Sequence, residues 1–261
     1  MGDLVSRRAL VCGASQGIGR SSAIELARRG ASVTLAARNA AALDVVLSEL
    51  PREEGQDHSA LTLDLSRPDE ASSRLEEHLE AKGPHTILVN NTGGPPGGPV
   101  FEATAEAFLA AFTAHVLSSQ RIVQLLVPGM KKDGYGRIVN IVSTSVRQPI
   151  PGLGVSNTIR GAVASWAKTL AGELGPAGIT VNNVLPGATR TGRLVSLIEG
   201  KSQRSGKTVA EVEGEMKATI PLQRFAEPEE VAAAVGFLAS PAAAYITGVS
   251  LPVDGGRTSC L

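Results

Sequence analysis

The stretch that decides the fold is residues 8–20, which read Arg-Ala-Leu-Val-Cys-Gly-Ala-Ser-Gln-Gly-Ile-Gly-Arg. Its first five residues, 8–12, are mostly apolar, as in a buried strand. An alanine-rich helical pattern follows its last glycine, Gly19. Gly13, Gly17 and Gly19 let the backbone turn tightly and approach another group closely, because they carry no Cβ atom. The stretch therefore predicts a strand, a tight turn and a helix, which together begin a βαβ unit.

Short apolar runs alternate with longer helical patterns along the whole chain. We expect strands at residues 8–12, 32–36, 59–63, 86–90, 136–142, 179–184 and 249–253. We expect helices at about residues 17–29, 39–49, 68–82, 104–131, 153–174 and 227–239. Strands this apolar are typical of a parallel sheet that is buried on both faces. The predicted fold class is α/β: a doubly wound parallel sheet of about seven strands with helices on both faces, a Rossmann fold.

The turn after the first strand has the features of a phosphate-binding loop. Helix-start N–H groups lack partners within the helix, and the helix dipole adds partial positive charge, so both stabilise a pyrophosphate. A glycine cluster alone is a weak signal, but this one lies between a strand and a helix, as a dinucleotide site requires. The residues expected to bind the cofactor here are Gly13, Ser15, Gln16, Gly17, Ile18 and Gly19.

The end of the second strand indicates which dinucleotide is bound. Residues 35–39 read Leu-Ala-Ala-Arg-Asn. An acid there would bind the ribose 2′-hydroxyl of NAD, whereas an arginine accommodates a 2′-phosphate. Arg38 therefore favours NADP(H) over NAD(H), although a surface arginine at a helix start gives the same pattern. Asp64 and Leu65 end the third strand, where Asp64 either meets the adenine or belongs to a helix N-cap region.

Composition excludes several classes of protein. The formal net charge is zero, with 25 basic and 25 acidic residues, so no charged field favours nucleic acid or an anionic membrane. The two cysteines, Cys12 and Cys260, predict neither a disulfide framework nor a metal site. No apolar run approaches the roughly 18 residues that span a bilayer, and residues 1–8 lack the core of a signal peptide. We therefore expect a cytoplasmic protein that acts on a small molecule.

Residues 1–261 are expected to form a single dinucleotide-binding domain. Residues 191–220 break the alternation, because they are polar and charged. They form either a solvated helical excursion or a helical flap over the substrate, since loops at the carboxyl end of such a sheet carry specificity. Residues 93–99, Gly-Gly-Pro-Pro-Gly-Gly-Pro, form either a rigid wall beside the cofactor or a turn-rich connector.

Four motifs resemble those of the classical short-chain dehydrogenase/reductase family and follow one another along the chain in the same order. They are the glycine motif at 13–19, Asn-Asn-Thr-Gly at 90–93, Pro-Gly-Ala-Thr-Arg-Thr at 186–191 and Val-Asp-Gly-Gly at 253–256. The resemblance covers nearly the whole chain and is nearest to the 3-oxoacyl-carrier-protein reductase branch. It implies a homodimer or homotetramer with NADP-dependent oxidoreductase activity. It also implies further cofactor contacts from Asn91, Gly93, Arg160, Pro186, Gly187, Thr189 and Thr191.

The resemblance also locates the catalytic positions, and three of the four residue types differ. The family uses Asn, Ser, Tyr and Lys. Ser143 matches the Ser, but the Tyr position thirteen residues on is Ser156. The Lys position, four residues further, is Arg160, and the helical Asn position is His115.

These replacements remove the usual acid. A Tyr beside a Lys can release a proton because the cation lowers its pKa, whereas a Ser hydroxyl is a much weaker acid and an Arg keeps its proton. Ser143 and Ser156 can still donate hydrogen bonds to a carbonyl oxygen. Arg160 can bind ribose hydroxyls, and its planar fork suits a carboxylate or a phosphate.

His115 is the candidate proton relay, because an unperturbed imidazole has a pKa of about 6.5. A structural histidine between helices is the alternative. The leading interpretation is an NADP-dependent oxidoreductase that acts on the carbonyl or hydroxyl group of a small molecule through an atypical site. A non-redox dehydratase or isomerase, and a catalytically silent NADP-binding protein, remain open alternatives.

Overall fold

The computed structural model describes residues 2–53 and 55–260. Seven parallel strands form one sheet in the order β3-β2-β1-β4-β5-β6-β7. The strands are β1 (Arg8–Cys12), β2 (Ser32–Ala37), β3 (Ser59–Thr62), β4 (Ile87–Asn90), β5 (Gly136–Ile141), β6 (Ile179–Pro186) and β7 (Ser250–Val253). The order reverses between β1 and β4, which creates the crevice where such sheets bind ligands. The predicted fold class is confirmed.

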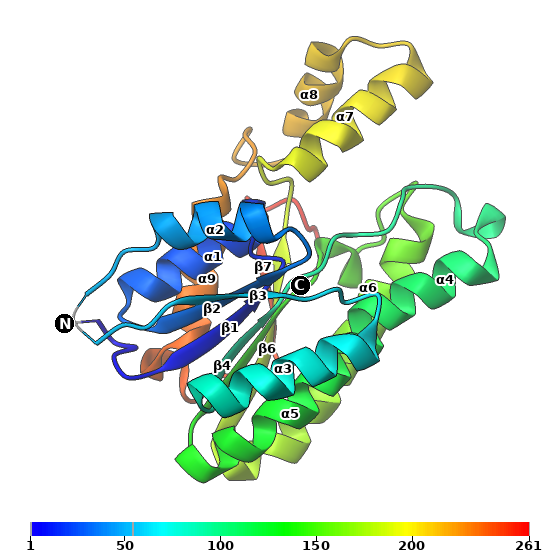
Figure 1. Cartoon of the computed structure of the whole chain (residues 1–261). Coiled ribbons are helices and arrows are strands. Elements are labelled where there is room, and N and C mark those ends of the chain that lie inside the picture. Colours follow the sequence, from blue (N-terminus) through cyan, green and yellow to red (C-terminus); the bar gives the residue numbers. More distant parts are fainter. Residues whose placement is uncertain (1, 54, 261) are drawn as a thin grey trace.

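Helices cover both faces of the sheet, and each face has its own apolar core (Figure 1). One face carries α1 (Gly17–Arg28), α2 (Ala40–Glu49) and α9 (Pro228–Ala239). The other carries α3 (Pro68–Lys82), α5 (Ser118–Asp133) and α6 (Gly154–Leu174), and α4 (Ala105–Phe112) packs on α6. Short 3-10 turns are η1 (Val100–Glu102), η3 (Thr144–Val146), η4 (Gly175–Ala177) and η5 (Pro241–Ala243). Among the described residues, none of these helices is both long and apolar enough to cross a membrane.

The helix predicted at 104–131 is not continuous. A π-helical turn, η2 (Thr113–Leu117), separates α4 from α5. Such turns replace i→i+4 hydrogen bonds by i→i+5 bonds and are frequent at functional sites. The apolar pattern continues through the turn, so periodicity alone predicts one long helix.

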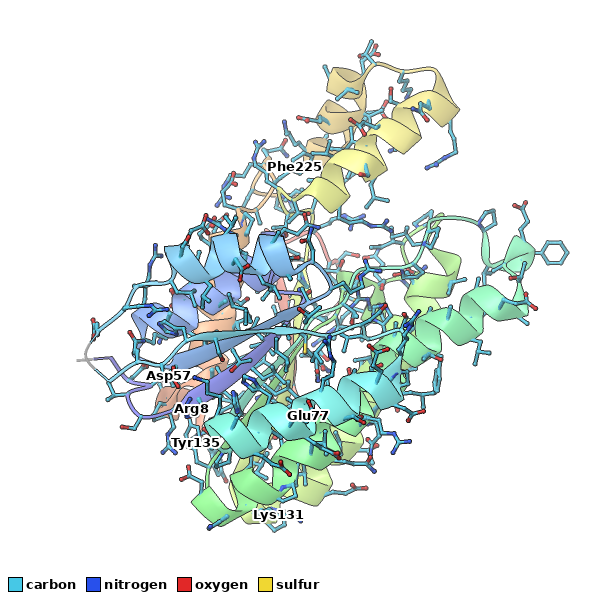
Figure 2. The ribbon with its side chains drawn as sticks, in the orientation of Figure 1. Arg8, Asp57, Glu77, Lys131, Tyr135 and Phe225 are labelled. Carbon is cyan, nitrogen blue, oxygen red and sulfur yellow. The ribbon has the colours of Figure 1, made fainter. Side chains whose placement is uncertain are left out.

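The polar segment at 191–220 forms a lobe of two helices, α7 (Gly192–Ser205) and α8 (Val209–Ala218). In Figure 1 this lobe, coloured yellow, projects away from the sheet. Figure 2 labels Phe225 at the base of the lobe. The lobe has its own small core, made of Leu194, Ile198, Val212, Ile220 and Phe225. A separate core allows the lobe to hold its shape independently of the main sheet.

A ladder of three buried side-chain amides and one serine hydroxyl crosses four neighbouring strands. Asn90 donates to Asn140 at 2.9 Å, and Asn140 donates to Asn183 at 3.0 Å. Asn183 then donates to the hydroxyl of Ser250 at 3.1 Å. These residues face one another in the strand register, so each amide bridges adjacent strands. The ladder fixes the register of β4 to β7, and in β4 and β5 it lies directly below the loops that follow these strands.

We expect Asn140→Leu to lower the free energy of unfolding by about 2–5 kcal/mol, because the buried amide nitrogen of Asn90 loses its acceptor and the buried amide oxygen of Asn183 loses its donor. Urea denaturation with an unchanged m-value measures the loss. The matched control is Thr180→Val, since the buried Thr180 hydroxyl has no hydrogen-bond partner among the described residues. That variant should be as stable as the wild type, and equal stability of both variants would contradict a structural role for the ladder.

Candidate active site

The loop between β1 and α1 is shaped by close backbone approach. Gly13 and Gly17 have φ angles of +60° and +55°, a region that side chains disfavour. A Cβ atom on Gly13 would lie 2.6 Å from the Asn91 carbonyl oxygen, and one on Gly19 would lie 2.1 Å from the Gly13 carbonyl oxygen. The Asn91 side chain also donates to the Gly13 carbonyl at 3.3 Å. The segment after β4 therefore holds this loop in place.

The start of α1 fits a phosphate. Its N-cap residue, Gln16, makes no side-chain capping bond in the described chain, and the first turn holds no acid. In contrast, threonine side chains cap α4, α7 and α8. An uncapped helix start offers free N–H groups and positive potential to an anion. Ser15 and Ile18 are half-buried beside it, and Gln16 is exposed.

The next two strands bring Arg38, Asp64 and Leu65 to the same edge of the sheet. Arg38 is exposed directly after β2. The pKa of Asp64 is lowered, mainly by a backbone hydrogen bond from Ser66 and less by the positive charge of Arg38. The Leu65 carbonyl accepts a hydrogen bond from the Ser118 hydroxyl. The charge of Arg38 thus lies where a 2′-phosphate group is expected.

The segment after β6 closes on the glycine loop. Thr191 caps α7 by accepting from the Leu194 N–H at 3.4 Å. Its Cγ2 atom would lie 3.1 Å from a Cβ atom on Gly17. Pro186 and Gly187 are half-buried and Thr189 is buried. Four of the predicted cofactor segments therefore meet at the carboxyl ends of β1, β2, β4 and β6.

Arg160 lies beside the end of β5 and the loop that follows β4. Its guanidinium donates to the Ile141 carbonyl at 2.7 Å and to the Thr92 carbonyl at 3.3 Å, so it links the ends of β5 and β4. Only 9% of the residue is exposed. Burial, and then the charge of Arg193, lower its pKa to about 10. The group is therefore a fixed cation at neutral pH.

The two predicted catalytic serines are half-buried. Ser143 follows β5, and its hydroxyl accepts the Ser145 N–H at 3.1 Å. Ser156 lies in the first turn of α6, one helical turn before Arg160. Because α6 packs on η3, Ser156 and Ser143 belong to neighbouring elements.

His115 lies in the π-helical turn and is 3% exposed. Burial, and then the charge of Arg160, lower its pKa to about 3, and a hydrogen bond with the Gly93 backbone opposes this shift. The expected pKa near 6.5 therefore does not apply. The histidine does lie beside Arg160, but it is neutral at physiological pH.

Neither tyrosine of the chain lies at this site. Tyr135 immediately precedes β5, at the opposite edge of the sheet, where Figure 2 labels it. Its ring lies between the guanidinium groups of Arg7 and Arg137, at 3.9 and 4.0 Å, and its hydroxyl donates to the Ala239 carbonyl at 2.6 Å. Tyr245 is fully exposed after η5. No tyrosine elsewhere in the chain replaces the one absent from position 156.

Sequence reasoning did not select Arg193, which lies in the first turn of α7. Its guanidinium donates to the Pro95 carbonyl at 2.7 Å, in the loop that follows β4. Arg193 is itself exposed. The only signal in the sequence was the charged character of residues 191–220, which does not say which cation contacts the loop after β4. Among the described residues, no three His, Cys, Asp or Glu side chains are grouped to hold a metal ion.

Comparison with known proteins agrees with this architecture. The family model described as enoyl-(acyl carrier protein) reductase matches residues 13–258. A putative ketoacyl reductase of Streptomyces coelicolor is 35% identical over 253 residues, which are 96% of this chain and 97% of the relative. L-Sorbose reductase from Gluconobacter frateurii, solved with NADPH and L-sorbose, has a TM-score of 0.92 and 30% identity, covering 100% of this chain and 99% of its own. A structure described as a short chain dehydrogenase/reductase family protein has a TM-score of 0.85 and 31% identity, covering 99% of this chain and 100% of its own. The chain belongs to the short-chain dehydrogenase/reductase family.

Proposed function

We propose that the protein is an NADP-dependent oxidoreductase that transfers a hydride between its cofactor and the carbonyl or hydroxyl carbon of a small organic molecule. The observation that carries this proposal is the uncapped, acid-free start of α1 beside a glycine loop, with Arg38 at the end of β2. The cofactor is NADP(H), the one with which the similar L-sorbose reductase was solved. The α7–α8 lobe is the helical flap over the substrate.

When bound, the reduced cofactor supplies a hydride to the carbonyl carbon. A hydride consists of one hydrogen nucleus and two electrons. Ser143 and Ser156 then orient the carbonyl oxygen by hydrogen bonds. The Arg160 cation stabilises the negative charge that grows on that oxygen. Because Arg160 holds its proton, water supplies the proton that completes the alcohol. His115, as a neutral ring, orients neighbouring groups and donates no proton from an imidazolium.

The missing acid restricts the substrates. A placed general acid typically contributes about 10²–10⁴-fold to such a step. A carbonyl activated by a neighbouring electron-withdrawing group needs less of this help. Diketones, quinones and oxo acids are therefore the substrates we propose, with the corresponding alcohols for the reverse direction.

We also propose a homodimer or homotetramer. Around α4 the chain exposes large apolar side chains, which water disfavours and a second copy would cover. They are Phe101, Leu109, Phe112 and Leu117.

The first test follows NADPH absorbance at high enzyme concentration against diketones, quinones, oxo acids and 3-oxo-thioesters, with cofactor binding followed by fluorescence in the same cuvette. We expect oxidation above the rate without enzyme for at least one activated carbonyl. Tight NADPH binding without oxidation of any compound would instead favour the dehydratase, isomerase or silent alternatives.

Arg38→Ala should weaken NADPH binding by about 10–100-fold and leave NADH binding nearly unchanged, because a charge-assisted hydrogen bond to the 2′-phosphate is lost. Fluorescence titration with both cofactors measures the two dissociation constants. Arg28→Ala is the matched control, since Arg28 is exposed in the last turn of α1. Equal weakening of NADPH and NADH would show that Arg38 does not select the cofactor.

The pH profile of kcat/KM should show no inflection near pH 6.5. His115, with a pKa lowered to about 3, is already neutral above pH 5, and Arg160, with a pKa of about 10, stays protonated to pH 8.5. Steady-state assays between pH 5 and 8.5 test this expectation. An inflection near pH 6.5 that disappears in His115→Gln would contradict it and restore the proton relay.

A further inference from the structure

Two guanidinium groups approach the loop after β4 from different elements. Arg160 projects from α6 and Arg193 from α7, and both donate to carbonyls of this loop. A Cβ atom on Gly94 would lie 3.7 Å from Nη2 of Arg193 and 3.9 Å from Nη2 of Arg160. Both guanidinium groups therefore lie within van der Waals reach of the loop at Gly94.

These two cations have no acidic partner. Arg160 and Arg193 take part in none of the ion pairs formed within residues 2–53 and 55–260, and in that part of the chain their side-chain hydrogen bonds go only to backbone carbonyls. Arg190, three residues before Arg193, shows the contrast, because it pairs with Glu227 at 2.8 Å. A shortage of acids on the chain does not explain the difference, since acidic and basic residues are equal in number.

Arg193 is exposed, so the cost of lacking an anion falls on Arg160. A buried cation normally requires an anion, and Arg160 is nine-tenths buried. The neighbouring charge of Arg193 adds repulsion, which contributes to the lowered pKa of Arg160. The start of α7 adds further positive potential on the same side. An anionic ligand would relieve all three effects at once.

We propose that Arg160 and Arg193 bind a carboxylate of the substrate, so that the protein acts on oxo acids or the corresponding hydroxy acids. This inference rests on the proposed hydride transfer and names its substrate class. The phosphates of the cofactor have separate ligands in the start of α1 and Arg38. Arg193 is carried by a lobe with its own core, so the lobe supplies part of the substrate site. A planar guanidinium pairs with a carboxylate through two parallel hydrogen bonds.

The test compares 2-oxo-4-phenylbutanoate with its ethyl ester, which has the same carbonyl but no charge. Calorimetry measures binding of each to the complex with NADP⁺, in which no hydride is available. NADPH oxidation by each is followed separately. We expect the acid to bind about 10–100-fold more tightly than the ester, and Arg193→Gln to reduce this preference to about threefold or less.

Arg204→Gln is the matched control, because Arg204 is an exposed cation in the last turn of the same helix. It should keep the preference for the acid, and Arg193→Gln should leave the dissociation constant of NADP⁺ unchanged. Loss of NADP⁺ binding in Arg193→Gln would instead assign the cation to the cofactor and overturn the inference.

The two proposals fail in different ways. Oxidation of NADPH with equal binding of acid and ester, or no binding of the acid at millimolar concentration, overturns the carboxylate site. Preferential binding of the acid that Arg193→Gln abolishes, without NADPH oxidation, supports the carboxylate site and overturns the hydride transfer.

Discussion

A buried positive charge constrains this site more than any other interaction. Removing a guanidinium from water costs several kcal/mol, which hydrogen bonds must offset. Arg160 obtains two of them from the Ile141 and Thr92 carbonyls, and so ties the ends of β5 and β4 together. The same charge opposes protonation of His115, whose pKa is about 3. One residue therefore positions the loops, keeps the neighbouring imidazole neutral and supplies the local electrostatic potential.

The register of the sheet below the site determines where these loops lie. The carboxyl ends of parallel strands lie at the same edge of the sheet. A shift of register between two neighbouring strands would therefore displace the loops that follow them. The amide ladder from Asn90 through Asn140 and Asn183 prevents such a slip, because its members meet only in one register. Asn91, the residue after the ladder begins, then contacts the glycine loop. The amide ladder is thus continuous with the glycine loop through the neighbouring residues Asn90 and Asn91.

Much of this arrangement could be predicted from the sequence, because strand–helix alternation and glycine spacing are local signals. All seven strands lie where the apolar runs placed them, with bounds that differ by at most two residues. Three features required the structure. The π-helical turn at 113–117 keeps the apolar periodicity, so the pattern does not show it. The low pKa of His115 depends on burial and on a cation from another helix. The hydrogen bond from the exposed Arg193 to the Pro95 carbonyl depends on where the lobe lies.

The family resemblance implies that Ser156 and Arg160 replace a tyrosine and a lysine, and under the proposed function the two replacements have one physical explanation. A lysine beside a tyrosine is useful because its charge makes the phenol a better acid. Without the tyrosine, a lysine has no phenol whose pKa it could lower. An arginine at that position offers more hydrogen-bond donors, held in a fixed plane. A serine at 156 also leaves the first turn of α6 without a bulky ring beside Arg160. In the proposed function, the permanent positive charge of Arg160 takes the place of a tyrosine acid. Permanent charge stabilises an oxyanion without proton transfer, and it does so best for substrates whose carbonyl is already activated.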